Sequence, residues 1–119
     1  MVSPDQSRCM YPSPKYDYGS TLSQVDALNY RSERFPKFAN ATVLKATLSP
    51  GEMLYNPRGW WHMVESLDKS ISVNNFGIDR KGLLVDHTRE KLKYKLHELG
   101  LYGRDCTCHM VVDGKRVAR

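Results

Sequence analysis

The sequence predicts a mainly β domain followed by one amphipathic α-helix. Short β-rich runs separated by tight turns lie between residues 41 and 76, leucines recur at helical spacing over about 83–99, and turn formers dominate residues 1–40. At 119 residues, 40% hydrophobic and 26% charged, the chain has the size and composition of one folded domain or of part of a larger one.

Residues 1–40 are predicted to be mostly loop, because prolines and glycine interrupt them and no helical stripe or alternation persists. A disordered tail rarely carries many aromatic residues, yet this segment has six of them. We therefore expect it to lie against a folded surface, through Tyr11, Tyr16, Tyr18, Tyr30, Phe35 and Phe38.

Residues 41–76 are predicted to form four short strands, over 41–48, 53–56, 60–66 and 70–76. Ser-Pro-Gly-Glu and Asn-Pro-Arg-Gly separate the first three strands, and both sequences are typical of tight turns. Four strands so close in sequence indicate antiparallel structure of the sandwich or barrel type.

Residues 79–119 are predicted to hold a helix over about 83–99 and a basic tail, with a short hairpin around Asp113-Gly114. Gly100 is a natural end for the helix. Its apolar stripe either covers the sheet, which is the interpretation we favour, or forms a dimer interface. The stripe consists of Leu84, Leu92, Leu96 and Leu99.

The net charge of +5 resides mainly in residues 79–119, where ten Lys/Arg face six Asp/Glu. This excess is typical of a solvated helix face, so nucleic acid is not the partner we expect. No apolar run approaches the roughly 18 residues of a membrane span. Three cysteines, an odd number, fit a reducing interior, and we expect an intracellular protein of the cytoplasm or nucleus.

Few residues have the spacing of a metal site. His62 follows two tryptophans at the start of a predicted strand, although a lone histidine is more often a packed or surface residue. His87 and Glu90 are interpreted as a solvated helix face. Residues 106–109, Cys-Thr-Cys-His, bring three zinc ligands together, but zinc sites usually need a further ligand pair elsewhere. Cys9 is the only other thiol in the sequence, so we interpret Cys106 and Cys108 as unpaired thiols in a loose tail.

The stretch 47-TLSPGEMLYNPRGWWHMVESLDKSISVNN-75 resembles the distal part of a JmjC, cupin-like hydroxylase domain, in the order and spacing of several motifs. The segments 23-SQVDALNYRSERFPKF-38 and 4-PDQSRCMYPSP-14 resemble the small-JmjC asparaginyl and arginyl protein hydroxylases. The resemblance covers about residues 4–76. It implies that residues 1–78 are the C-terminal part of a double-stranded β-helix (cupin or jelly-roll).

The resemblance also implies a function. Members of this family are Fe(II)- and 2-oxoglutarate-dependent dioxygenases that act on protein side chains, hydroxylating or demethylating them. His62 stands where the distal iron ligand belongs, and Asn74 matches an asparagine near the cosubstrate pocket. Trp60 and Trp61 would then fix the orientation of His62. No residue of this chain is assigned a catalytic role.

The sequence departs from the family pattern in one decisive respect, because no His-x-Asp or His-x-Glu triplet occurs in it. One imidazole does not hold Fe(II) usefully when two of three protein ligands are missing. We therefore expect a fragment that is inactive alone and does not bind iron or 2-oxoglutarate stably. The alternative is a non-catalytic cupin-like binding or scaffold module.

Overall fold

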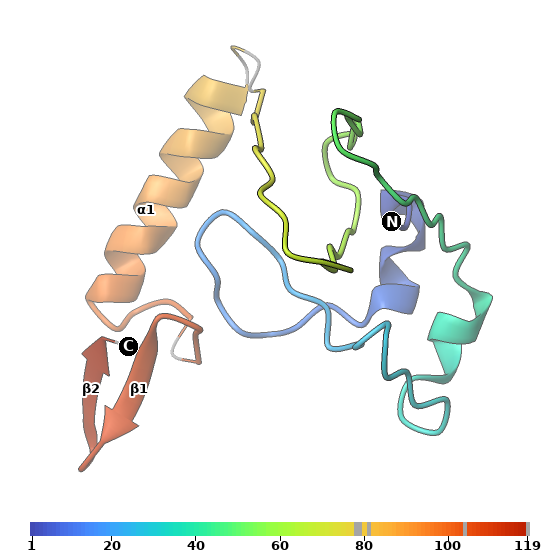
Figure 1. Ribbon diagram of the computed structural model, residues 1–119. Helices are drawn as coiled ribbons and strands as arrows, with labels where there is room; N and C mark the ends of the chain where they lie inside the picture. The colour runs from blue at the N-terminus through green and yellow to red at the C-terminus, as the bar shows by residue number, and fades with distance from the viewer. Residues whose placement is uncertain (78–79, 81, 104, 119) are drawn as a thin grey trace. The chain divides into compact units, whose positions relative to one another are not determined.

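The computed structural model describes residues 1–77, 80, 82–103 and 105–118. The chain divides into two compact units. Unit 1 comprises Met1–Pro12 and Ser23–Ser70, and unit 2 comprises Ser13–Leu22 and Ile71–Arg119. Figure 1 shows helices η1 and η2 in the segments of unit 1, and α1, β1 and β2 in those of unit 2.

Unit 1 is built around an aromatic and aliphatic core that comes mainly from residues 1–40. The 3-10 helices η1 (Pro4–Met10) and η2 (Pro36–Asn40) both begin at a proline, whose fixed φ suits a first helical turn. The expectation that the aromatic residues of this segment pack against a folded surface is confirmed for those in unit 1. The core consists of Val2, Met10, Val25, Phe35 and Phe38, with Tyr11, Tyr30, Ala41 and Trp61 packed against it.

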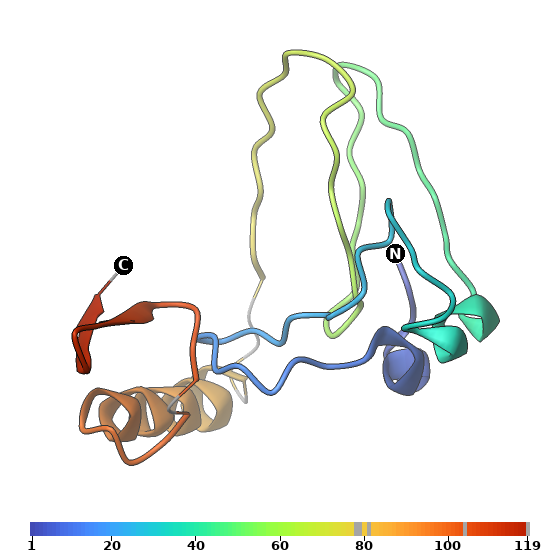
Figure 2. The same cartoon turned by 90° about the horizontal axis from the view of Figure 1, so that it is seen from below.

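The four predicted strands of residues 41–76 are extended, but they form no ladder with one another in the part of the chain that the structure describes. Figure 2 draws 41–70 as long loops without arrows. The pairings that do occur involve the first two residues. Backbone hydrogen bonds join Met1 to Leu44 on one side and Val2 to Trp61 on the other.

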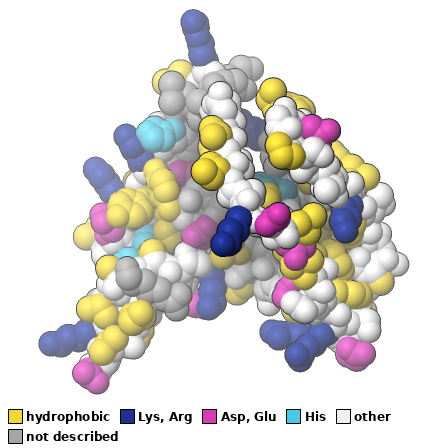
Figure 3. Space-filling view, viewed as in Figure 1, with side chains coloured by type: hydrophobic (Ala, Val, Ile, Leu, Met, Phe, Trp, Pro, Cys, Tyr) yellow, Lys and Arg dark blue, Asp and Glu magenta, His cyan; other side chains and the backbone are white. Residues whose placement is uncertain are grey.

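The physical reason is that a strand is stable only when its backbone N–H and C=O groups meet those of a neighbouring strand. The extended segments leave many large apolar side chains in solvent, among them Met53 (92% exposed), Ile71 (97%) and Val73 (92%). Yellow apolar side chains are accordingly frequent on the surface in Figure 3. The double-stranded β-helix thus stays a prediction for this chain.

Unit 2 contains the predicted helix and hairpin. A π-helical turn, η3 (Gly82–Asp86), leads into α1 (His87–Glu98), and the predicted start near residue 83 falls in that turn. Strands β1 (His109–Val112) and β2 (Lys115–Ala118) pair antiparallel, so the tail is ordered. Positive φ angles at Asp113 (49°) and Gly114 (74°) are those of the type I′ turn that Asp-Gly favours.

The buried face of α1 is not the leucine stripe. Leu84 (71% exposed), Leu92 (60%) and Leu99 (71%) lie mostly in solvent, whereas His97 is fully buried. The favoured interpretation, that the leucines cover a sheet, is therefore wrong for these three, whereas Leu96 is half-buried. Neighbouring elements of unit 2 contact the helix through Tyr94 and His97 instead. Dimerisation through the stripe stays a prediction.

A crossing of the bilayer by a helix is excluded for the residues described. Twelve-residue α1 is too short and too polar for it, and no other described helix has the necessary length and hydropathy.

Candidate functional site

The His62 site lies on unit 1, directly after the Asn-Pro-Arg-Gly turn. That turn closes through a hydrogen bond from Trp60 N–H to the Pro57 carbonyl, with Gly59 at φ 81°. Trp61 is fixed more firmly than its neighbours. Its indole N–H donates to Ser7 Oγ (2.9 Å), and its backbone exchanges two hydrogen bonds with Val2.

The imidazole of His62 is exposed, and its Nδ1 lies 3.3 Å from the Trp60 carbonyl oxygen. A carbonyl can only accept, so Nδ1 carries the proton in that contact and Nε2 keeps its lone pair. The ring of His62 thus contacts the Trp60 carbonyl, while the Trp61 side chain is held by Ser7; that the tryptophans orient His62 for a metal stays a prediction. What His62 could offer a metal is one accessible nitrogen.

The two predicted site residues, His62 and Asn74, belong to different units, and their roles stay predictions. Asn74 is exposed and belongs to unit 2, whereas His62 belongs to unit 1. Among the described residues, three or more His, Cys, Asp or Glu side chains come close enough to share a metal ion in one group, which does not include His62. Since Fe(II) in this kind of oxygenase needs two histidines and a carboxylate on one face, the donor set around His62 does not fit it.

The group that is assembled lies in unit 2. We call it the His97 cluster: His97, Cys106, Cys108 and His109. Each contributes one ligand atom, and the four atoms all lie within 4.8 Å of one another. His97 Nε2 is 3.2 Å from Cys108 Sγ and 3.3 Å from His109 Nδ1. His109 Nδ1 is in turn 3.5 Å from Cys106 Sγ and 3.2 Å from Cys108 Sγ.

The cluster corrects the interpretation of residues 106–109 as a loose tail with two unpaired thiols. Cys106 is buried, and both thiols face imidazole nitrogens. The sequence reasoning missed His97, because it sought a further ligand pair whereas one residue on the last turn of α1 completes the set. The signal was present as a histidine nine residues before Cys106, followed by the turn-forming Gly100 and Gly103.

The chain after α1 is shaped to turn His97 toward the cysteines. Leu101 and Tyr102 N–H groups both donate to the Leu96 carbonyl, which closes the helix with Gly100 at φ 73°. The Tyr102 carbonyl then accepts a hydrogen bond from His97 Nδ1 (2.9 Å). At Gly103 (φ 55°) a Cβ would lie 2.5 Å from the Tyr16 Cβ, so glycine is required there.

The loop 13–22 covers the cluster from the other side. The Tyr16 ring lies 4.4 Å from the imidazole of His97, centroid to centroid, and its backbone pairs with Asp105 and Thr107. Burial, together with the carboxylate of Glu90, raises the pKa of the Tyr16 hydroxyl. Tyr16 is thus a packing side chain that excludes water from the histidine.

Asp17 secures this loop to the segment that carries the cysteines. Its carboxylate accepts hydrogen bonds from the hydroxyls of Ser20 and Thr107, and Thr107 stands between Cys106 and Cys108. These two bonds, that of Ser20 more than that of Thr107, lower the pKa of Asp17 from its usual value. The ionised carboxylate therefore belongs to the folded form of this loop.

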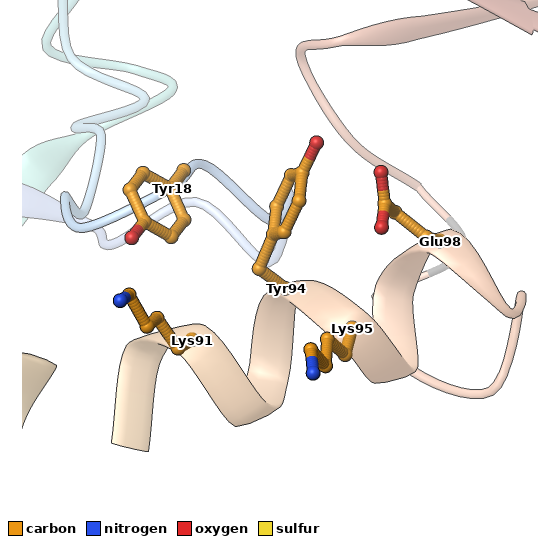
Figure 4. A pocket seen from close by; sticks show the side chains of 5 residues that line it. All are labelled: Tyr18, Lys91, Tyr94, Lys95 and Glu98. Atoms are coloured by element: carbon orange, nitrogen blue, oxygen red, sulfur yellow. The ribbon is translucent and has the colours of Figure 1, made fainter. Parts of the chain in front are cut away.

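An open groove of about 660 Å³ lies on another side of α1, lined by Tyr18, Lys91, Tyr94, Lys95 and Glu98 (Figure 4). The Tyr18 and Tyr94 rings meet edge to face, 5.3 Å apart. A hydrogen bond to the Glu98 carboxylate raises the pKa of Tyr94. Neither predicted site residue lines this groove, and His87, also on α1, is exposed as expected.

Comparison with known proteins identifies the family. The model of the cupin-like domain matches residues 1–76, well over half of the chain. The chain belongs to the cupin-like domain family. This confirms the resemblance found over residues 4–76, including its JmjC character, because several relatives carry that name.

Several curated proteins are similar to part of this chain. HSPB1-associated protein 1 homolog of Danio rerio is 39% identical over 78 residues, which are 64% of this chain and 17% of that protein. JmjC domain-containing protein D of Dictyostelium discoideum is 36% identical over 73 residues (61% and 16%). Lysine-specific demethylase 8 of Xenopus tropicalis is 42% identical over 63 residues (50% and 14%).

The chain thus spans about one sixth of the length of the first curated relatives it matches. No solved structure gives a significant match. The family model ends at residue 76, so α1 and the His97 cluster lie outside the matched region.

Proposed function

We propose that this chain is the distal part of a JmjC-type 2-oxoglutarate-dependent oxygenase domain that hydroxylates or demethylates protein side chains. The match of residues 1–76 to the cupin-like domain carries this proposal. Within it, His62 follows the tryptophan pair as the distal iron ligand does in the family. Asn74 stands at the position of an asparagine that lies near the cosubstrate pocket in some members.

The chain alone is proposed to be inactive. Its own part in the chemistry is to present the Nε2 of His62, on a backbone held by the pairing of Trp61 with Val2. The other two iron ligands would have to come from a His-x-Asp or His-x-Glu that these 119 residues do not contain.

The exposed apolar side chains of the extended segments support the same proposal. Met53, Val64 and Ile71 are at least 81% exposed, although their β-rich segments are suited to pack into a sheet. In a complete double-stranded β-helix such faces are covered by the facing sheet. We therefore propose that further strands of the domain pair with residues 41–76.

The test has two parts. The chain as it stands, supplied with Fe(II) and 2-oxoglutarate, is expected to produce no more succinate than its His62→Ala variant. A longer protein read from the coding sequence upstream of Met1 is expected to carry the His-x-Asp and to produce succinate. In that protein His62→Ala should abolish turnover, while the exposed His87→Ala should leave it unchanged. Turnover that survives His62→Ala, or an upstream sequence without the triplet, would contradict the proposal.

A binding or scaffold module is the second candidate, and one observation favours it. Two relatives, 40% and 39% identical to this chain over 78 residues each, are named for association with HSPB1. For this chain we propose a protein rather than a small molecule as the partner. Saturable binding of purified HSPB1, with no activity in the longer protein, would favour this candidate over the oxygenase.

A further inference from the structure

We propose that one structural Zn²⁺ ion is bound by the His97 cluster. The site lies outside the region that matches the cupin-like domain and shares no residue with the proposed iron site at His62. It therefore goes beyond the proposed function, and the two can fail separately.

Four of the six distances between ligand atoms in the cluster are close to those of a tetrahedral zinc site. Zn–S bonds of about 2.3 Å and Zn–N bonds of about 2.0–2.1 Å place neighbouring ligand atoms about 3.3–3.8 Å apart. The four distances given above run from 3.2 to 3.5 Å, and all six pairs of ligand atoms fall within 4.8 Å. A small adjustment of side-chain torsions completes the tetrahedron.

The orientation of His97 is the second, independent observation. The Tyr102 carbonyl accepts a hydrogen bond from Nδ1, so the proton resides there and the Nε2 lone pair faces Cys108 Sγ and His109 Nδ1. Metal-binding histidines typically donate their other N–H to a carbonyl or carboxylate in this way. A fully buried imidazole among thiols with its lone pair so directed is prepared to bind a cation.

The donor set selects the metal. Two thiolates and two imidazoles are a common combination for structural zinc, and two thiolate charges neutralise Zn²⁺ without any further group. All four tetrahedral positions are filled by protein, so no position is open for a cosubstrate or oxygen. The site is thus structural, unlike the open iron site of an oxygenase.

A metal at this point would supply stability that unit 2 otherwise lacks. Its buried side chains, among the residues described, are Tyr16, Cys106 and His97, which make a small core for a unit of 59 residues. Zinc would join the end of α1, the segment after it and the start of β1, which lie side by side in Figures 1 and 2. Small domains commonly rely on such a cross-link.

The decisive measurement is a Co²⁺ titration of the full reduced chain. Co²⁺ replaces zinc and reports its ligands, since thiolate coordination gives a charge-transfer band and tetrahedral geometry gives intense visible bands. We expect one equivalent to bind, both bands to appear, and one equivalent of Zn²⁺ to remove them. Elemental analysis of the protein purified under reducing conditions should find one zinc per chain. No thiolate band, or no zinc in the purified chain, would overturn the proposal.

Matched variants locate the site. The thiol of Cys108 is exposed, so Cys108→Ser disturbs packing little. It should weaken Co²⁺ binding by more than 100-fold, because losing a residue that merely hydrogen-bonds to a metal ligand already costs about 10–100-fold. Cys9→Ser removes the one thiol outside the cluster and should change nothing, as should His87→Ala at an exposed residue of α1. An equal loss in Cys9→Ser, or a disulfide between Cys106 and Cys108 that persists in reductant, would contradict zinc binding here. Because the wild-type titration needs no variant, a misfolded variant does not remove the test.

Discussion

Unit 1 buries five apolar side chains, Phe35 and Phe38 among them, whereas His97, the one fully buried side chain among the described residues, belongs to unit 2. Unit 1 carries most of the family motifs, and its extended segments expose their apolar residues to solvent. Unit 2 lies largely outside the family match, yet it brings four metal-binding side chains together. In this chain a recognisable sequence and an assembled site therefore occur in different places.

The difference has a physical origin. The site implied by the family motifs needs ligands from strands far apart in sequence, so it exists only when the sheet is complete. The His97 cluster needs a helix end and a 13-residue segment, over which chain closure is inexpensive in entropy. Local assembly explains why unit 2 forms its site by itself.

The largest expected effect is that removing zinc destabilises unit 2 and not unit 1. A strong chelator should speed amide hydrogen exchange throughout residues 97–118, because apparent zinc-binding free energies of about 10–16 kcal/mol exceed the stability of a small domain. Protection in η1 and η2 should change much less. Hydrogen exchange followed by mass spectrometry measures both in one sample. Equal loss in both units would mean that the cluster does not stabilise unit 2 selectively.

The converse perturbation addresses unit 1. Trp61→Ala removes a partly buried side chain that contacts the core and donates to Ser7, and it should lower the free energy of unfolding by about 2 kcal/mol, less than the roughly 3–5 of a fully buried tryptophan. Tyr55→Ala, at an aromatic residue 82% exposed, should have almost no effect. Urea denaturation followed by far-UV circular dichroism compares them, and Co²⁺ binding should be unaltered in both variants.

Substitutions at two glycines of unit 2 test whether the close approach of Tyr16 to residue 103 positions His97. Gly103→Ala combines a left-handed backbone, which costs about 1–2 kcal/mol, with a collision of the new Cβ with Tyr16. Gly100→Ala carries the same backbone cost, but nothing lies within 4 Å of its Cβ. Co²⁺ affinity should therefore fall clearly further in Gly103→Ala. Identical affinities would show that the approach of Tyr16 to residue 103 does not position His97.

The smallest effect concerns the carboxylate that secures loop 13–22. Thr107→Val should raise the pKa of Asp17 toward its usual value of about 3.9, and Ser20→Ala should raise it more, because the Ser20 bond lowers it most. The folded pKa is depressed, so Asp17 stabilises the fold above its unfolded pKa and loses this contribution as the pH falls through the folded pKa. A ¹³C NMR titration of the carboxyl measures both variants. An unchanged pKa in both would exclude these bonds in solution.

The sequence by itself was sufficient for features encoded by neighbouring residues. It predicted the helix before Gly100, the Asp113-Gly114 hairpin and the cupin-like family from motifs in residues 4–76. Pattern analysis did not reveal which face of α1 is buried, because leucines at helical spacing indicate a core-facing stripe wherever the true core lies. It also did not show that the strand-like segments lack a sheet, since β propensity describes a segment and pairing requires a partner.

Only the tertiary structure decided where the metal-binding side chains meet. Cys106, Cys108 and His109 are adjacent in sequence and were visible as three ligands, but a fourth ligand is defined by distance in space. The helix end, Gly103 and the Tyr102 carbonyl together turn His97 toward them, and none of these contacts can be read from spacing alone. The sequence determines which metal-binding side chains are present, whereas coordination depends on the angles and distances between their ligand atoms, which arise once the backbone has folded.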